Sequence, residues 1–333
     1  MSEIILGLGT SHSPLLAMDA DLWVERGKDD RRNRALCLTD GRTVTYDELA
    51  AEVNDRYAPL ATLANFRGQA SLAQQYLDRL ADEIERARPD VMIIVGDDQE
   101  ELFGLQNMPA LAISYGARMT MYPKNEMVPN LPEWLKVANV GYGMDKPQSY
   151  VADRDFALNL INGLLDQAVD VGSVGDVEDA KVAGFGHAFG FVVERLFRGR
   201  EIPTVPVLLN TYYPPSVPRA WRCYEIGQAL RTAVETIPGN ARVAIIASGG
   251  LSHFVADEEL DRIVLDAIRS KDPTALKALP PHALRSGSSE ILNWVLVAGA
   301  METTPLKWAE YIPVQRTPAG TGIGLGFAAW SAV

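Results

Sequence analysis

The sequence predicts an α/β fold with a central mixed β-sheet, helices on its faces, and a functional site at the carboxyl ends of the strands. Two observations lead to this fold class. Short apolar runs rich in β-branched residues alternate with longer segments of helical periodicity, which is typical of α/β folds. The 333 residues contain no internal repeat, low-complexity tract or Gly/Ser-rich linker. We therefore expect one domain over residues 1–333 rather than two.

Six short segments are expected to be strands, because they are apolar, rich in β-branched residues and flanked by turn-forming or charged residues. In chain order they are Glu3 to Leu8, Val91 to Val95, Leu111 to Ser114, Thr204 to Leu209, Val243 to Ala247 and Gly324 to Ala328.

Helices are expected between these strands, where apolar residues recur every three or four positions. The clearest series are Ala70, Ala73, Leu77, Leu80 and Ile84, and Phe156, Leu160, Leu164 and Ala168. Further helices are expected at about 188–198, 219–236, 257–270 and 289–300.

Two stretches depart from the alternation. Residues 22–57 carry many charges and only short apolar runs, which indicates an elaborated surface insertion with short helices. Residues 119–148 contain four prolines and two glycines, which indicates a long ordered loop or a lid.

The composition argues against several classes of protein. A net charge of −12 disfavours binding to nucleic acid or to an anionic membrane surface, since both need a basic face. The two cysteines, Cys37 and Cys223, form no CxxC motif and no disulfide framework, which fits a reducing cytoplasm. The N-terminal residues do not resemble a signal peptide, and no stretch approaches 18 uninterrupted apolar residues. We therefore expect a cytoplasmic protein without a membrane span.

Only four histidines occur, so their positions are informative. His12 and His253 follow expected strands in GLGTSHSP and ASGGLSHF, where open α/β sheets build their sites. His187 lies in GFGHAFG at an expected helix start, and its flanking glycines let a ligand come close. Each of the three is either a functional residue or hydrogen-bonded scaffolding, and we treat His282 as ordinary.

Carboxylates occupy comparable positions. Asp97, Asp98 and Gln99 follow the second expected strand, and Glu290 opens an expected helix in SGSSEILNW. An acidic strand end can bind a metal or relay protons, but it can also be a helix N-terminus, which favours acidic residues. Glu290 is likewise either a metal ligand in a cleft or a first-turn acidic residue beside a capping serine.

Motifs of other enzyme classes are missing, namely GxSxG, GxxxxGK[ST], HExxH and a strand-to-helix GxGxxG. A mixed set of neutral imidazoles and carboxylates remains. Such a set suits divalent iron with coordination positions left open for oxygen and substrate.

The chain resembles the class III extradiol ring-cleavage dioxygenases, typified by the β subunit of protocatechuate 4,5-dioxygenase. The resemblance covers nearly the whole chain in order. It rests on TSHSPLL, DVMIIVGDDQ, GFGHAFGFVVERLF, NTYYPPSVPRAWRCYEIGQALRTAVE, ASGGLSHF, SGSSEILNWVLVAGAM and YIPVQRTPAGTGIGLGF. The region DDRRNRALCLTDGRTVTYDEL looks closer to the branch that includes 3-O-methylgallate dioxygenases.

The resemblance implies roles for individual residues. His12 and Glu290 would bind iron, and Gln99 stands where the family has a histidine as its remaining ligand. Asp98 is an alternative carboxylate ligand at that position. An amide oxygen is a weaker donor to divalent iron than an imidazole nitrogen, so the identity of the metal is left open. His253 would act as the acid/base, and His187 would line the pocket and orient or polarise the catechol.

The resemblance also implies a function. The chain would be an Fe(II)-dependent extradiol dioxygenase that uses O2 to open the ring of an aromatic diol acid such as 3-O-methylgallate, gallate or protocatechuate. The substrate carboxylate needs a cation, for which Arg219, Arg285, Arg316 and Lys124 are candidates. The alternatives are a metal-dependent hydrolase and a non-catalytic binding protein on the same fold. We expect a homo-oligomer, a dimer, with or without a small partner subunit.

Overall fold

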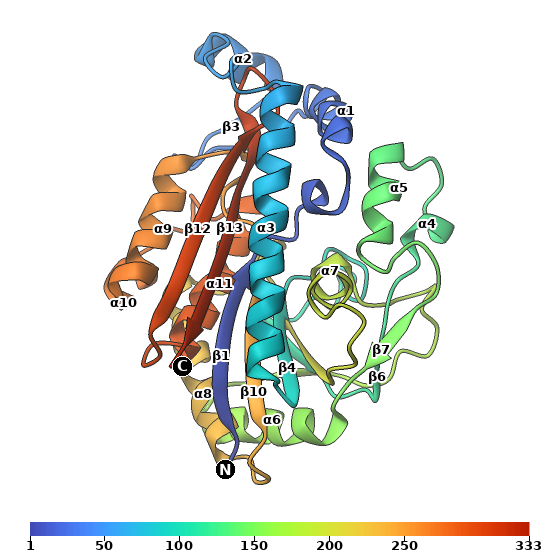
Figure 1. The fold of residues 1–333 in the computed structure, drawn as a ribbon, viewed down its shortest axis with the longest axis vertical. Helices are drawn as coiled ribbons and strands as arrows, with labels where there is room; N and C mark the ends of the chain where they lie inside the picture. Colours follow the sequence, from blue (N-terminus) through green and yellow to red (C-terminus); the bar gives the residue numbers. More distant parts are fainter. Residues whose placement is uncertain (333) are drawn as a thin grey trace.

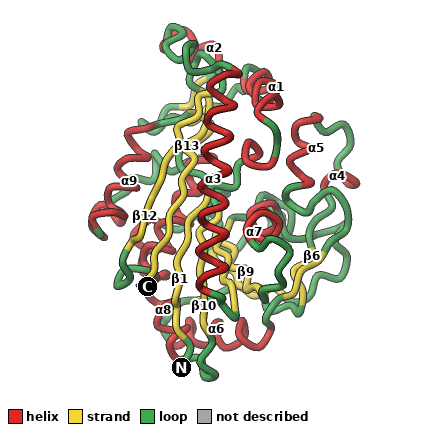
Figure 2. Tube along the Cα trace, viewed as in Figure 1, coloured by secondary structure: helices red, strands yellow, loops and turns green. Residues whose placement is uncertain are grey.

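The computed structural model describes residues 1–332 and contains a nine-stranded mixed sheet with helices on both faces (Figure 1). The strand order is β11-β13-β1-β10-β4-β9-β5-β8, and β12 pairs with β13. Figure 2 shows the strands as one continuous layer with helices in front of it and behind it. The predicted fold class is therefore confirmed.

Four parallel strands form the centre of the sheet. They are β1 (Glu3–Thr10), β10 (Arg242–Ser248), β4 (Val91–Gly96) and β9 (Thr204–Leu209). Because they are parallel, their carboxyl ends meet at one edge of the sheet. All four were expected from the sequence, so the position of a site at this edge was also predictable.

Antiparallel pairs extend the sheet on both sides. β13 (Thr321–Ser331) runs between β1 and the edge strand β12 (Leu306–Gln315), and β11 (His253–Val255) pairs with its first residues. On the other side, β5 (Leu111–Ser114) runs antiparallel to β9, and the edge strand β8 (Gly172–Val174) pairs in parallel with β5. The sequence analysis did not predict β12. Its charged residues and Pro313 weaken the strand pattern, but an edge strand tolerates a proline that cannot donate to the ladder.

Two layers of helices bury the sheet. On one face, α3 (Leu63–Ala87) and α7 (His187–Leu196) pack on side chains such as Leu8 and Ile94. In Figure 1, α3 runs along the front of the sheet. On the opposite face of the sheet, a second cluster forms around side chains such as Ile93. These side chains alternate along each strand with those that face α3 and α7. The helices on or beside that face are α6 (Arg154–Asp166), α8 (Ala220–Thr236), α9 (Glu258–Ser270), α10 (Pro273–Lys277) and α11 (Ile291–Ala300).

Residues 22–57 contain two helices and a small hairpin. α1 (Ala20–Asp30) is followed by β2 (Leu36–Cys37), β3 (Thr43–Val44) and α2 (Tyr46–Val53). The segment is more than surface decoration, because Trp23 of α1 is fully buried and its Nε1 donates to the Leu15 carbonyl at 3.0 Å. α1 is therefore fixed close to the residues that follow β1.

Residues 119–148 include two short helices, α4 (Lys124–Met127) and α5 (Glu133–Val140). A ribbon of β6 (Arg118–Thr120) and β7 (Ser149–Val151) closes the segment at its base. Within residues 1–332, no helix has the length and apolarity needed to cross a membrane. The assignment of one domain and of a lid stays a prediction.

Candidate active site

His12 lies two residues beyond β1, between that strand and the 3-10 turn Pro14–Ala17. Ser248, the last residue of β10, fixes the orientation of its ring. The Ser248 hydroxyl donates to the Ala188 carbonyl at 2.6 Å, so it accepts from Nδ1–H of His12 at 3.1 Å. This hydrogen bond leaves Nε2 of His12 with a free lone pair, the arrangement that metal-binding histidines require.

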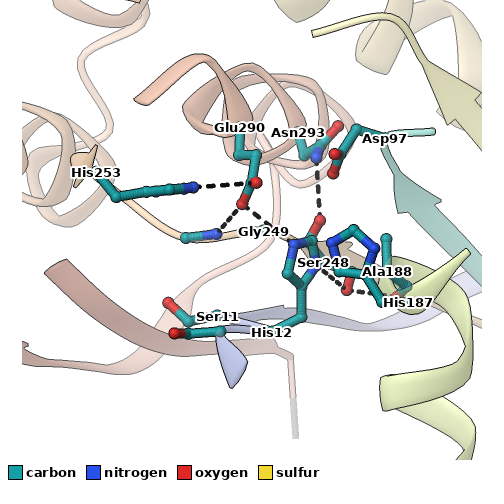
Figure 3. Close-up of polar contacts among 12 residues, drawn as sticks. Ser11, His12, Asp97, His187, Ala188, Ser248, Gly249, His253, Glu290 and Asn293 are labelled. Carbon is teal, nitrogen blue, oxygen red and sulfur yellow. Dashed lines mark hydrogen bonds and ion pairs between the residues drawn. The ribbon is translucent and has the colours of Figure 1, made fainter. Parts of the chain in front are cut away.

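Glu290 lies next to the His12 ring (Figure 3). It ends the 3-10 turn Ser286–Glu290 that leads into α11, and it is 2% exposed. Its Oε2 lies 3.2 Å from His12 Nε2 and accepts the backbone N–H of Gly250 at 2.6 Å. The capping role considered for a preceding serine is not seen here, because Ser288 is bonded to the backbone of His253 instead.

His253, the first residue of β11, lies beside Glu290. Its Nε2 is 3.1 Å from Glu290 Oε1, and its Nδ1 is 2.9 Å from the Leu251 carbonyl, which can only accept. Nδ1 therefore carries a proton, and Nε2 is the atom that can take up or release one. A Cβ on Gly287 would lie 1.9 Å from His253 Cδ2, so only glycine leaves room for the ring at this position.

The residues that follow β4 point in different directions. Asp97 is 1% exposed, and its Oδ1 has no hydrogen-bond partner within the described part of the chain. Asp98 instead accepts the backbone N–H groups of Leu102 and Phe103 at 2.9 and 3.0 Å, which commits both of its oxygens to the following turn. Gln99 donates its side-chain amide to Asp97 Oδ2 at 3.1 Å. The carboxylate next to His12 is thus Asp97 rather than the Asp98 that we considered.

His187 begins α7, as expected, and its ring packs edge-on against His12 with centroids 4.6 Å apart. One ligand atom from each of His12, Asp97 and His187 can be chosen so that all three lie within 4.8 Å of one another. Behind His187, the buried Glu101 lies 3.6 Å from its Nδ1 and 3.0 Å from Lys124 Nζ.

Electrostatics make this cluster attractive to a cation. Burial would lower the pKa of His12, but the negative charges of Glu290, Asp97 and Glu101 outweigh it and raise the pKa. Burial and the charge of Glu290 raise the pKa of Asp97. Burial would also raise the pKa of Glu290, but His253 and His12 outweigh it and hold this pKa well below its usual range. Two carboxylates buried next to imidazole nitrogens match the charge and the donor preference of a divalent ion.

A cavity of about 260 Å³ opens onto these groups. His12, Gln99, His187, His253 and Glu290 all line it, so the structure brings together five of the residues named from the sequence. Asp97 and Asp98, which follow β4, do not line this cavity. The remaining lining residues include Arg26, Lys124, Trp134, Tyr142, Tyr212, Phe254 and Arg316.

Of the four cations considered for a substrate carboxylate, Lys124 and Arg316 line this cavity. Arg219 and Arg285 line a separate one. Sequence reasoning missed Arg26, which lies in the segment interpreted as a surface insertion. Its spacing of four residues from Asp30 on one helix face was the available signal.

The donor set fits a divalent metal. His12 Nε2 and Asp97 Oδ1 are buried and lack a directed hydrogen bond, which is costly unless another partner completes them. Adjacent ligands with bonds of about 2.0–2.2 Å lie roughly 3 Å apart, close to the 3.2 Å between His12 Nε2 and Glu290 Oε2. Imidazole nitrogen together with carboxylate oxygen is the donor type found in non-haem iron sites.

The chain belongs to the family described as the catalytic LigB subunit of aromatic ring-opening dioxygenases. The family model matches residues 66–326, which cover most of the sheet and every site residue except those that follow β1 and those of α1. This match confirms the resemblance drawn from the motifs.

Two curated relatives show local similarity. A gallate dioxygenase from Pseudomonas putida is 35% identical over 111 residues, which are 30% of this chain and 32% of the relative. A 2,3-dihydroxyphenylpropionate/2,3-dihydroxicinnamic acid 1,2-dioxygenase from Xanthobacter autotrophicus is 24% identical over 178 residues, 53% of this chain and 48% of the relative. The matched part of the chain therefore spans between a third and a half of these relatives.

Proposed function

We propose that the chain is an Fe(II)-dependent extradiol dioxygenase that opens the ring of a catechol- or gallate-type aromatic acid with O2. The observation that carries this proposal is the group of His12, Asp97, His187 and Glu290: His12, His187 and Glu290 line a small cavity, the buried Asp97 lies next to them, and His253 lies beside Glu290. Family membership and the two dioxygenase relatives support the same reaction class.

We propose His12 and Glu290 as iron ligands, with Asp97 as a third ligand. Asp97 has a free buried oxygen, whereas the amide of Gln99 is used in a hydrogen bond to that same carboxylate. When bound, divalent iron would supply open positions for the diol and for dioxygen and would carry electron density between them. Gln99 remains the ligand implied by the family pattern, and the two assignments are separable by mutation.

His253 is the proposed proton carrier. Its Nδ1 is held by the Leu251 carbonyl, so Nε2 can accept the second phenolic proton of a bound diol and return it later. Glu290 next to it stabilises the protonated ring. The Ser288 hydroxyl accepts a hydrogen bond from the backbone N–H of His253 and donates one to its carbonyl, which holds His253 in place through this exchange.

His187 and Tyr142 form the wall on the other side of the cavity. Their ring centroids are 5.5 Å apart, and the Tyr142 hydroxyl donates to the His12 carbonyl at 2.8 Å. The two rings are tilted by 56° to each other, so an aromatic substrate can pack against the face of one and the edge of the other. His187 can in addition donate a hydrogen bond to a ring hydroxyl, which would orient or polarise the substrate.

The test combines metal analysis with oxygen uptake. Protein purified without oxygen is analysed for bound metals, and is then mixed with gallate, protocatechuate or 3-O-methylgallate in an oxygen electrode cell. We expect iron near one equivalent and uptake of one O2 per diol consumed. Bound zinc without oxygen uptake would support the hydrolase alternative, and a metal-free protein that binds diols without turnover would support the binding-protein alternative.

A further inference from the structure

We infer that Arg316 and Arg26 form a carboxylate-binding subsite that selects aromatic substrates bearing an acid group. This inference rests on the proposed function, because it concerns which diols the same cavity accepts. Both arginines line the cavity that is also lined by His12, His253 and Glu290.

Arg316, which lines the cavity, has an unused buried donor. Its side chain is 4% exposed, and its Nε donates to Asp30 Oδ2 at 2.8 Å. Its Nη2 is buried and has no hydrogen-bond partner among residues 1–332. A buried guanidinium N–H without an acceptor is costly, and a carboxylate is the acceptor that best matches its planar geometry.

Arg26 lies beside Arg316 and shares the same counterion. Arg26 Nη1 donates to Asp30 Oδ1, and Thr321 donates its hydroxyl to Asp30 Oδ2 at 2.9 Å. A Cβ on Gly27 would lie 2.8 Å from the carbonyl oxygen of Arg316, so α1 packs directly on the turn after β12. The two arginines are therefore held by a rigid contact between distant parts of the sequence.

The charges at this end of the cavity do not balance. Two guanidinium groups share one buried carboxylate, Asp30, while the neighbouring Asp29 pairs with Arg32 at 2.6 Å. Burial and the charge of Arg316 lower the pKa of Arg26 to about 10, despite the nearby acids. One bound monoanion would neutralise the excess charge. Lys124 is not available in the same way, because it already pairs with Glu101 at 3.0 Å.

The volume of the cavity fits a small ligand such as a single ring with one acid group. Its volume of about 260 Å³ is below the usual ~300–1,000 Å³ of pockets for drug-sized ligands. Trp134 and Phe254 flank the Arg26 guanidinium at 4.9 and 5.8 Å, so the cation is exposed to apolar walls rather than to water. A hydrogen bond to a carboxylate is strong in such surroundings.

The test compares an acid with its neutral amide. Binding of 3,4-dihydroxybenzoate and 3,4-dihydroxybenzamide to the anaerobic protein is measured by calorimetry, so that no turnover is needed. We expect the protein to bind the acid about 10- to 100-fold more tightly, the range for a hydrogen bond between charged groups. Arg316→Gln should reduce this preference to about threefold or less, and Arg316→Lys should restore part of it.

Arg219→Gln is the matched control, since Arg219 lines a different cavity, and it should keep the full preference. If Arg316→Gln does not fold, Arg26→Gln provides the same comparison. Equal binding of acid and amide by the unmodified protein, or an unchanged preference in the folded variants, would overturn the subsite. An Arg316-dependent preference without oxygen uptake on any diol would instead overturn the proposed function and leave the subsite standing.

Discussion

Gln99 donates its side-chain amide to Asp97 Oδ2 at 3.1 Å, while the other oxygen of Asp97 has no hydrogen-bond partner among the residues that the structure describes. The amide thereby fixes the direction in which the free oxygen of Asp97 points. This contact offers Gln99 a role without direct metal binding. Residues that hold a metal ligand by a hydrogen bond commonly change metal affinity by about 10- to 100-fold when removed.

Asp97→Asn should lower iron affinity by at least about 10-fold, because it removes a carboxylate charge from the proposed metal group. Asp98→Asn is the matched control from the next position and should retain iron, since its oxygens face backbone N–H groups instead. Iron content after graded dialysis measures both. Loss of iron from the Asp98 variant alone would show that Asp98, and not Asp97, is the ligand.

Gln99→Ala and Gln99→His distinguish the two roles of this amide. If Gln99 acts by holding Asp97, both variants should bind iron more weakly. If Gln99 is itself a ligand, Gln99→His should bind iron more tightly than the unmodified protein, because imidazole is the better donor. We expect weaker binding by both, measured by competition with a chelator under anaerobic conditions.

His12→Ala should remove most of the bound iron, because it deletes a donor that faces both Glu290 and Asp97. His282→Ala is a suitable control, since His282 is exposed and outside the cavity. Elemental analysis of protein purified without oxygen gives the metal content directly. Equal iron content in both variants would contradict the proposed site.

His253→Gln should keep iron nearly intact and lower turnover by about 10²-fold or more, the usual effect of losing a positioned proton carrier. Oxygen uptake and metal content are measured on the same sample, so that a lost proton carrier is not confused with a lost metal. Turnover within about threefold of the unmodified protein across the pH range would show that His253 does not carry the proton.

Gly287→Ala should resemble His253→Gln in turnover, because the added methyl group would occupy the position of the His253 ring. Gly68→Ala is the control: a Cβ there meets nothing within 4 Å, and alanine favours the helix by about 0.5–1 kcal/mol. We expect the first variant to lose activity and the second to gain slightly in thermal stability. Full activity of Gly287→Ala would mean that the turn around Gly287 shifts enough to accommodate the methyl group without displacing His253.

Asp261 predicts a pH dependence of stability. It is fully buried in α9 and accepts hydrogen bonds from Ser252 and from the Tyr311 hydroxyl, yet burial raises its pKa to about 6. Between about pH 4 and pH 6 the folded chain therefore binds a proton at this group that the unfolded chain has released. The free energy of unfolding should fall as pH rises through this window, by up to about 3 kcal/mol, and should level off above it.

The measurement is urea unfolding from pH 4 to pH 7 for the unmodified protein and for Asp261→Asn. Other carboxylates titrate in the same window, so the difference between the two curves isolates Asp261. The stability of the unmodified protein relative to the variant should decline toward pH 6. A difference that does not change with pH would contradict the raised pKa.

The sequence was sufficient for the central strands and for the histidines, because buried parallel strands have continuous apolar runs and their carboxyl ends share one edge. It could not tell Asp97 from Asp98, since adjacent residues in a turn point in directions that depend on backbone angles and local hydrogen bonds. Arg26 was not predicted as a site residue for a different reason. Its partner Arg316 is 290 positions away in the sequence, and a charge on a short helix usually faces solvent.

The contact between α1 and the turn after β12 has a consequence for how such an enzyme can diverge. The residues proposed to bind and activate the ring lie mostly in the turns and at the helix starts near the carboxyl ends of the central strands, whereas Arg26 and Asp30 lie on a helix that precedes the 66–326 region matched by the family model. Exchange of that one helix could change which acid group the cavity accepts while leaving the ring-opening residues in place. With the proposed subsite, the preference for an acid group can evolve separately from the residues that open the ring.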